Sequence, residues 1–524
     1  MPGSPTASRA DSTADSSLGV LSCVFAALAA AILLSLPFLS VRFPPITDLP
    51  QQAAQVRLAS EALSEGSQYR FNLLAPGSLG YGLFAVSWLV TGAENAGRIA
   101  YLLLGWLWIG ALALLIRRQA RHPELIPLAT LFFFSHALYW GFLSFLFGAV
   151  VFLAWIILEE RLRRRPASRS EPLILGLGGL VLYASHALWF AAGVLWLGVV
   201  TAVSPLPTRR GWLRLAGLVP ALGLALLWLP SMKQSDFHSE TAWRTMPWAR
   251  LAPGEWVDSA FGGLQGPVEP VILGVIAVWL VLGLLEHRDQ LGRRIAPTFL
   301  LLGTLMLVAS LLLPDHLQNT LGFARRWTPI GMALLVIALP PPRIRQGLRW
   351  AVAFVLLATL TVATTASWKR FERFELEGLE ASLAALPDEP RLLGLDFYRL
   401  SQVVKTYPFF QNAAYGQVLK GGSLGFSFAS FPTSPVVFRQ WENPSWALGL
   451  EWLPSQIFER TDDFFYFDYA LIHTDPTGHA YFEQQEMLES VTGSARWRLY
   501  RVIQSVARSE SSVEPASDPR PVTL

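Results

Sequence analysis

The stretch LGVLSCVFAALAAAILLSLPFL, residues 18–39, carries no charged side chain. A helix rises about 1.5 Å per residue, so about 20 apolar residues cross the roughly 30 Å hydrocarbon core of a bilayer. The stretch therefore predicts a membrane-spanning helix. Ten further uncharged apolar runs follow it, at residues 99–116, 125–138, 141–158, 172–185, 187–203, 215–230, 271–285, 296–313, 328–339 and 351–366.

The composition agrees with a membrane protein. Of 524 residues, 52% are hydrophobic and only 15% are charged, which is too few charges for a water-facing surface of this size. The net charge of +3 gives no reason to expect nucleic acid as a partner. The single cysteine, Cys23, excludes an internal disulfide framework and a cysteine-rich metal site.

The basic residues between the runs predict an orientation. They collect in alternate connections, and cytoplasmic loops are the ones enriched in Lys and Arg. We therefore expect a cytoplasmic N-terminus and an extracytoplasmic segment after residue 366. Residues 79–90 form an apolar stretch too short to cross, which predicts a re-entrant or interfacial helix. The clusters are Arg117, Arg118 and Arg121; Arg161, Arg163, Arg164, Arg165 and Arg169; Arg209, Arg210 and Arg214; Arg288, Arg293 and Arg294; and Arg343, Arg345 and Arg349.

These patterns predict a mainly α fold, a polytopic bundle of about eleven spans with a small extracytoplasmic α/β domain. Apolar runs at residues 391–396, 469–473 and 497–502 read as strands of that domain. Asp396 and Asp475 follow two of them, and turn formation is the commoner role for such residues. The expected parts are a disordered cytoplasmic segment 1–17, a membrane domain 18–366 with outer loops 40–98 and 231–270, the soluble domain 367–504, and a disordered tail 505–524.

Asp48, in the first outer loop, allows two interpretations. With Pro50 in the first turn and Gln51 three residues later, it has the form of a capping box, whose carboxylate satisfies backbone donors. Alternatively the carboxylate performs chemistry. The spacing alone favours the cap. The acid lies directly after the first span, ahead of a short helix and a re-entrant stretch.

This arrangement resembles the C-type (GT-C) glycosyltransferases, and more closely a group of uncharacterised bacterial members whose first loop reads Asp-x-Pro-Asn-His. Here the last two positions are Gln51 and Gln52, so the His of that pattern is missing. The resemblance implies an essential acid in the first outer loop and a lipid phosphate held in the outer half of the membrane domain. The same family resemblance extends to residues Gly92–Arg98, Trp140–Gly148 and Tyr183–His186.

The predicted topology gathers several polar side chains at the outer surface. His186 has an unperturbed pKa of about 6.5 and suits a base, a ligand or a donor, or a helix-end imidazole bonded to a carbonyl. The pair Arg325 and Arg326 suits a phosphate clamp, or cations that snorkel to the interface. The candidate substrate-binding residues are Arg98, Tyr139, His186, Arg325 and Arg326.

The resulting hypothesis is an inverting glycosyltransferase of the bacterial inner membrane. Asp48 would act as general base on the acceptor, a glycan, lipid or protein outside the cytoplasm, and arginines would stabilise the departing polyprenyl phosphate. A divalent metal ion is compatible with this chemistry, but no convincing ligand set is visible. The alternatives are a flippase or transporter of lipid-linked saccharides and a non-catalytic envelope scaffold.

Overall fold

The computed structural model describes residues 8–232, 241–317, 320–440, 464–493 and 495–503. The predicted disordered tail lies outside these residues, as does the start of the predicted N-terminal segment. The chain divides into two compact units, each described by itself. Unit 1 comprises Met1–Glu372, Leu400–Pro408 and Phe428–Arg439, and unit 2 comprises Arg373–Arg399, Phe409–Ser427 and Gln440–Leu524.

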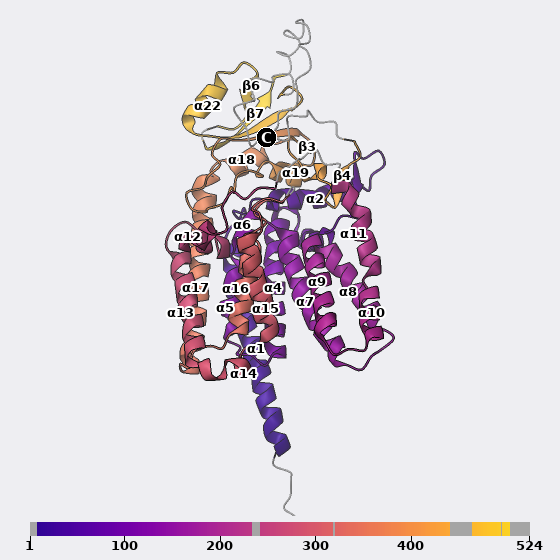
Figure 1. The fold of residues 1–524 in the computed structure, drawn as a ribbon. Coiled ribbons are helices and arrows are strands. Elements are labelled where there is room, and N and C mark those ends of the chain that lie inside the picture. Colours follow the sequence, from indigo (N-terminus) through magenta and orange to yellow (C-terminus); the bar gives the residue numbers. More distant parts are fainter. Residues whose placement is uncertain (1–7, 233–240, 318–319, 441–463, 494, 504–524) are drawn as a thin grey trace, which may run out of the picture. The chain divides into compact units, whose positions relative to one another are not determined.

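Unit 1 is a helical bundle, and its helices lie side by side in Figure 1. Five helices are long and apolar enough to cross a membrane, or up to seven if two bent pairs each count as one span. Four of the five are α4 (Ala93–Arg118), α7 (Leu143–Arg164), α13 (Val268–Glu286) and α17 (Gln346–Arg370). The fifth is α1 (Ser8–Ser40), which begins inside the stretch predicted to be disordered.

The remaining predicted runs also fall on helices, although these are shorter or bent. The bent pairs are α10 (Thr208–Ala216) with α11 (Val219–Met232) and α14 (Leu291–Arg294) with α15 (Pro297–Leu312). The short helices are α5 (Leu125–Thr130) with α6 (His136–Trp140), α8 (Glu171–Ser185), α9 (Ala187–Val203) and α16 (Trp327–Ala338). The chain is thus mainly helical with several apolar helices, as expected, while the count of about eleven crossings stays a prediction.

The first outer loop is built from short elements. It contains α2 (Leu49–Glu61), the three-residue strand β1 (Tyr69–Phe71) and α3 (Tyr81–Thr91), which covers the stretch predicted to be re-entrant. Residues Gly92–Arg98, which carry part of the family resemblance, form the start of α4, with Gly92 at φ +78° as its N-cap. The other outer loop holds α12 (Pro253–Ala260).

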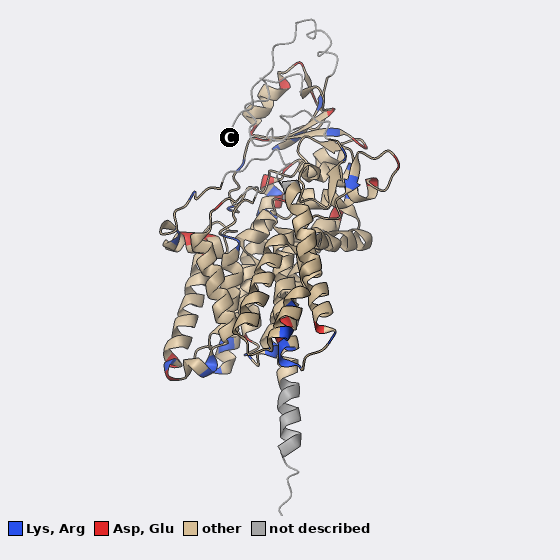
Figure 2. Cartoon of the chain, turned by 45° about the vertical axis from the view of Figure 1, so that its right-hand side comes forward, with Lys and Arg blue, Asp and Glu red and all other residues tan. Residues whose placement is uncertain are grey.

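Charged residues of unit 1 gather at the helix ends, and the helix middles are uncharged (Figure 2). At one end, Arg121 after α4 donates to the carbonyls of Ala338 and Leu339, at the end of α16, at 3.0 and 2.7 Å. Arg349 of α17 pairs with the buried carboxylate of Glu124 at 2.7 Å. These contacts bring several of the basic clusters to the same end of the bundle, because each joins residues of different clusters or their helices.

Unit 2 contains a five-stranded sheet in the order β3-β2-β5-β7-β6. Strands β2 (Arg391–Asp396), β5 (Tyr469–His473) and β7 (Trp497–Val502) have the bounds predicted from sequence, whereas β3 (Ser423–Leu424) and β6 (Leu488–Ser490) were not predicted. Strand β2 pairs in parallel with β3 and β5, and β7 is antiparallel to β5 and β6. The α-helices in the described part of the unit are α18 (Leu379–Ala384), α19 (Ala414–Lys420) and α22 (Pro476–Glu483).

One late segment of the chain belongs to unit 1. Residues Phe428–Arg439, here called the wall segment, carry β4 (Val436–Phe438), which pairs antiparallel with β1 of the first outer loop. The predicted soluble domain 367–504 therefore includes a piece that packs with the membrane domain. More than 350 residues separate the two paired strands along the chain, so no local pattern announces this pairing.

Candidate functional site

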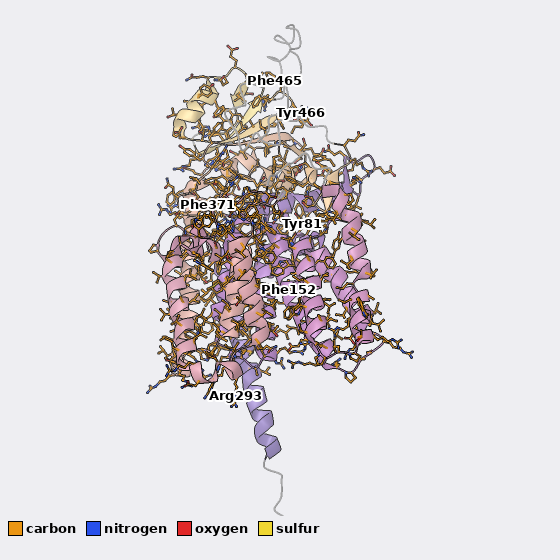
Figure 3. The ribbon with its side chains drawn as sticks, in the orientation of Figure 1. Tyr81, Phe152, Arg293, Phe371, Phe465 and Tyr466 are labelled. Atoms are coloured by element: carbon orange, nitrogen blue, oxygen red, sulfur yellow. The ribbon has the colours of Figure 1, made fainter. Side chains whose placement is uncertain are left out.

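A cavity of about 400 Å³ lies in unit 1. This volume is in the range of about 300–1,000 Å³ typical of small-molecule sites. Tyr81 belongs to its lining and lies toward the end of the bundle opposite Arg293, with Phe152 between them (Figure 3). The polar part of the lining consists of Asp48, Gln52, Tyr81, Ser144, His186, Thr320, Arg326, Thr433 and Ser434.

Asp48 is the N-cap residue of α2, but its side chain makes no capping hydrogen bond. The structure therefore does not support the interpretation of this carboxylate as a helix cap. Its backbone N–H instead donates to the carbonyl of Trp140 at 3.2 Å. Asp48 is one of the residues that line the cavity.

Gly141 lets the chain approach Asp48 this closely. Its φ is +84°, a conformation that L side chains rarely adopt, and a Cβ there would lie 2.9 Å from both the backbone N and the Cβ of Asp48. The side chain of Gln52 donates to the Gly141 carbonyl at 2.5 Å and accepts from the Tyr101 hydroxyl at 2.8 Å. Hydrogen bonds thus join the turn after α6 to the start of α2, and the two segments together position the carboxylate.

Asp48 lies in a buried environment that disfavours the charged form of its carboxyl group. Burial raises the pKa of its carboxyl to about 8, and the positive charge of Arg326 opposes the rise. No ion pair joins Asp48 to Arg326 within the described part of the chain, although both line the cavity. An acid with a pKa near the working pH suits proton transfer.

Arg326 reaches the cavity from the loop before α16. Its Nε and Nη2 donate to the Leu321 carbonyl at 3.1 and 2.6 Å, and its Cζ lies 3.5 Å from the centre of the Phe142 ring. Burial lowers its pKa to about 9 and Asp48 opposes that shift, so the guanidinium remains a cation at neutral pH. It is an anion-binding group held flat against an aromatic face.

His186 lies between α8 and α9 and lines the same cavity. Its Nδ1 accepts a hydrogen bond from the backbone N–H of Leu188 at 3.1 Å. Burial lowers its pKa to about 3, with Arg326 adding to the effect, so the ring is neutral at pH 7. A neutral ring that accepts at Nδ1 carries its proton on Nε2, which makes His186 a hydrogen-bond donor and a poor base.

The other predicted substrate-binding residues lie outside the cavity lining. Arg325 pairs with Glu255 of α12 at 2.7 Å. Arg98 donates to the Val41 carbonyl at 2.7 Å and to Asn95. The buried Tyr139 accepts from the backbone N–H of Thr47 at 2.9 Å through its carbonyl. These contacts hold the segments that carry Asp48 and Arg326.

Three groups of lining residues were not predicted from sequence. Gln52 entered the analysis only as a departure from a family pattern, and Tyr81 only as part of an apolar stretch. The wall segment was assigned to the soluble domain. A polar side chain inside a short apolar stretch, as Tyr81 is at the start of α3, is the one local signal that points to the cavity.

The two acids singled out in unit 2 have partners of their own. Asp475 accepts from the backbone N–H of Gly478 at 2.6 Å and caps α22. Asp396, at the end of β2, accepts from His473 Nδ1 at 2.8 Å, and the His473 ring stacks on Trp497 at 4.3 Å. Asp475 thus has the structural role that is commonest for such residues.

The cavity offers few ligands for a metal ion. The described residues contain no group of three or more His, Cys, Asp and Glu side chains that would hold one. Asp48 and His186 are the cavity-lining residues of those types. This donor set, one carboxylate and one imidazole, does not fit a resident metal.

Comparison with known proteins gives one likeness. No protein-family model matches the chain, and no curated protein matches it. The crystal structure of ArnT from Cupriavidus metallidurans in the apo state is similar to the chain, with 15% identity and a TM-score of 0.41. The likeness covers 91% of this chain and 98% of that chain.

Proposed function

We propose that the protein is a membrane glycosyltransferase that moves a sugar from a polyprenyl-phosphate carrier to an extracytoplasmic acceptor. One observation carries the proposal. The Asp48 carboxylate and the Arg326 guanidinium line one cavity without forming an ion pair in the described residues. An acceptor hydroxyl to be deprotonated and a carrier phosphate to be stabilised fit between a base and a cation placed in this way.

The proposed reaction is a single displacement. Asp48 takes the proton of the acceptor hydroxyl, whose oxygen attacks the anomeric carbon of the carrier-linked sugar. The bond from that carbon to the phosphate oxygen breaks, and its electron pair stays on the phosphate. Arg326 stabilises the developing charge, and the Nε2–H of His186 donates to an oxygen of the substrate. Attack from the face opposite the phosphate inverts the anomeric carbon.

The remaining predicted residues enter the proposal as supports. Arg98, Tyr139 and Arg325 bond to neighbouring segments and hold the loops in which Asp48 and Arg326 lie. Replacing one of these three residues would change sugar transfer indirectly, by moving Asp48 or Arg326. The resemblance of the first outer loop to the GT-C superfamily supports the same assignment.

The test compares Asp48→Asn with the wild type in membranes supplied with a panel of polyprenyl-phosphate sugars. Asparagine keeps the size of the side chain and removes the base, so we expect transfer to fall by about 10²–10⁴-fold, the usual contribution of acid–base catalysis. Unchanged transfer by the variant would remove Asp48 from the chemistry. Movement of labelled carrier between leaflets without sugar transfer would instead identify a transporter.

A further inference from the structure

The wall segment forms an uncharged side of the cavity. Its lining residues are aromatic, prolyl and hydroxyl-bearing, whereas the ionisable groups Asp48, Tyr81, His186 and Arg326 come from other segments of unit 1. Phe428 and Phe431 lie edge to face with ring centres 5.6 Å apart. The contributing residues are Phe428, Phe431, Pro432, Thr433 and Ser434.

The wall segment is fastened to the helix that begins at Asp48. Gln51 and Gln55, one turn apart on α2, accept hydrogen bonds from the backbone N–H groups of Phe428 and Val436, both at 3.0 Å. Residues four apart on a helix lie on one face, so the two glutamines present a matched pair of acceptors. The Phe428 backbone is therefore held within one helical turn of Asp48.

A second attachment fixes the other side of the wall segment. The Asn72 side chain donates to the carbonyls of Pro432 and Ser434 at 2.8 and 3.2 Å, and its backbone N–H donates to the Pro435 carbonyl at 2.8 Å. The β1–β4 pairing continues directly from these bonds. Attachment at both ends gives the lining residues of the segment a fixed place in the cavity wall.

We infer that the wall segment binds a neutral sugar ring, with Phe431 against an apolar face of the ring. The inference rests on the proposed function and adds the part of the site that holds carbohydrate. A phosphate needs cationic or N–H donors, which Arg326 and His186 supply elsewhere in the cavity. Aromatic faces beside hydroxyl groups match a sugar, which has apolar C–H faces and a polar rim.

A neutral ring in this position has two sources, the sugar of the donor or the sugar of a glycan acceptor. Both would pass next to Asp48, because the attacked carbon and the attacking hydroxyl meet there. The two sources differ in their covalent link to the carrier phosphate. Binding measurements with linked and unlinked sugars therefore separate them.

The experiment measures dissociation constants by native mass spectrometry of the full-length protein in detergent. The four probes are undecaprenyl phosphate, undecaprenyl phosphoglucose, its mannose counterpart, and methyl β-D-glucopyranoside added with undecaprenyl phosphate. Phe431→Ala should leave the affinity for undecaprenyl phosphate unchanged, which also shows that the variant is folded. It should weaken a sugar-bearing probe about tenfold, and Phe431→Tyr should restore it.

The probe whose affinity falls in Phe431→Ala identifies the source of the sugar ring. Loss of affinity for the carrier-linked sugars assigns the donor ring to Phe431, and loss for the methyl glucoside assigns the acceptor ring. Phe438→Ala is the matched control, because Phe438 lies in the same segment but packs on Tyr69, with ring centres 4.9 Å apart, and does not line the cavity. It should leave the sugar affinities unchanged.

Three results would overturn the inference. They are equal affinity of the wild type for the carrier with and without sugar, unchanged sugar binding in Phe431→Ala, and the same loss in both phenylalanine variants. Arg326→Gln tests the proposed function separately, since it should weaken undecaprenyl phosphate itself. If that affinity stays unchanged, the phosphate site fails, whatever the phenylalanine variants show.

Discussion

The titration of Asp48 gives the proposed reaction a defined pH dependence. Burial raises the pKa of its carboxyl to about 8, so the acid form prevails below that pH and the basic form above it. A general base must be deprotonated, and we expect kcat/KM for sugar transfer to rise about tenfold per pH unit from pH 6 to 7. The rate should level off above about pH 8, as measured with polyprenyl-phosphate sugar in detergent.

The control for this profile is His186→Gln. The pKa of His186 is about 3, so its ring is neutral across the whole measured range and contributes no limb. The variant should lower the rate through the lost donor and keep the position of the limb. A limb near pH 6.5 that vanishes in His186→Gln would make the imidazole the base and contradict the assignment of Asp48.

The candidate site was predictable to the extent that topology fixes which residues share a membrane surface. Asp48, His186 and Arg326 were predicted in this way, and the structure brings them into one cavity. The sequence could not show which of Arg325 and Arg326 lines the cavity. Neighbouring residues point in different directions, and the presence of Glu255 beside one and Phe142 beside the other is decided by packing between distant segments.

A buried ion network joins α7, α8 and α10. Arg214 is fully buried and donates to Glu159 at 2.7 Å and to Glu171 at 2.6 Å. Removing one partner of such a network leaves the opposite charge buried without compensation, which typically costs about 3–5 kcal/mol. Arg214→Ala should therefore lower the melting temperature in detergent by several degrees. The melting temperature is measured by fluorescence-detected size-exclusion chromatography of heated samples.

Arg209, one turn earlier on α10, provides the matched control. It is exposed, and an exposed substitution usually changes stability by no more than about 0.5 kcal/mol. Arg209→Ala should melt with the wild type. Equal melting of the two variants would mean that α10 does not depend on the network.

The helices and strands were predictable where the pattern is local. Uncharged runs identified every long helix, and short segments rich in apolar residues gave the bounds of β2, β5 and β7. Strand β4 was missed because three residues carry too little pattern and the partner strand β1 lies in the first outer loop. The length of α4 was underestimated, because its first two turns carry the charged residues Glu94 and Arg98 and so fell outside an uncharged run.

The bundle as a whole has two chemically different ends. Arginines of separate clusters meet at one end, where Arg121 contacts the Arg294 carbonyl at 2.5 Å and Arg210 pairs with Glu171 at 2.9 Å. The first outer loop, Tyr81 and the cavity lie toward the other end (Figure 3). The proposed function requires the cavity end to face away from the cytoplasm, which is also the side that the arginine clusters predict.

Single-cysteine labelling tests that orientation in intact cells. Cys23 is the only cysteine, so Cys23→Ser gives a background without thiols. Ser64, after α2, and Ser168, after α7, are both exposed and lie in the outer and inner loops of the predicted topology. A membrane-impermeant maleimide added outside should label Ser64→Cys directly, and should label Ser168→Cys only after the membrane is permeabilised. The reverse pattern would turn the cavity toward the cytoplasm and exclude an extracytoplasmic acceptor, whereas labelling of both sites from outside would contradict the odd number of crossings, three, that is predicted between them.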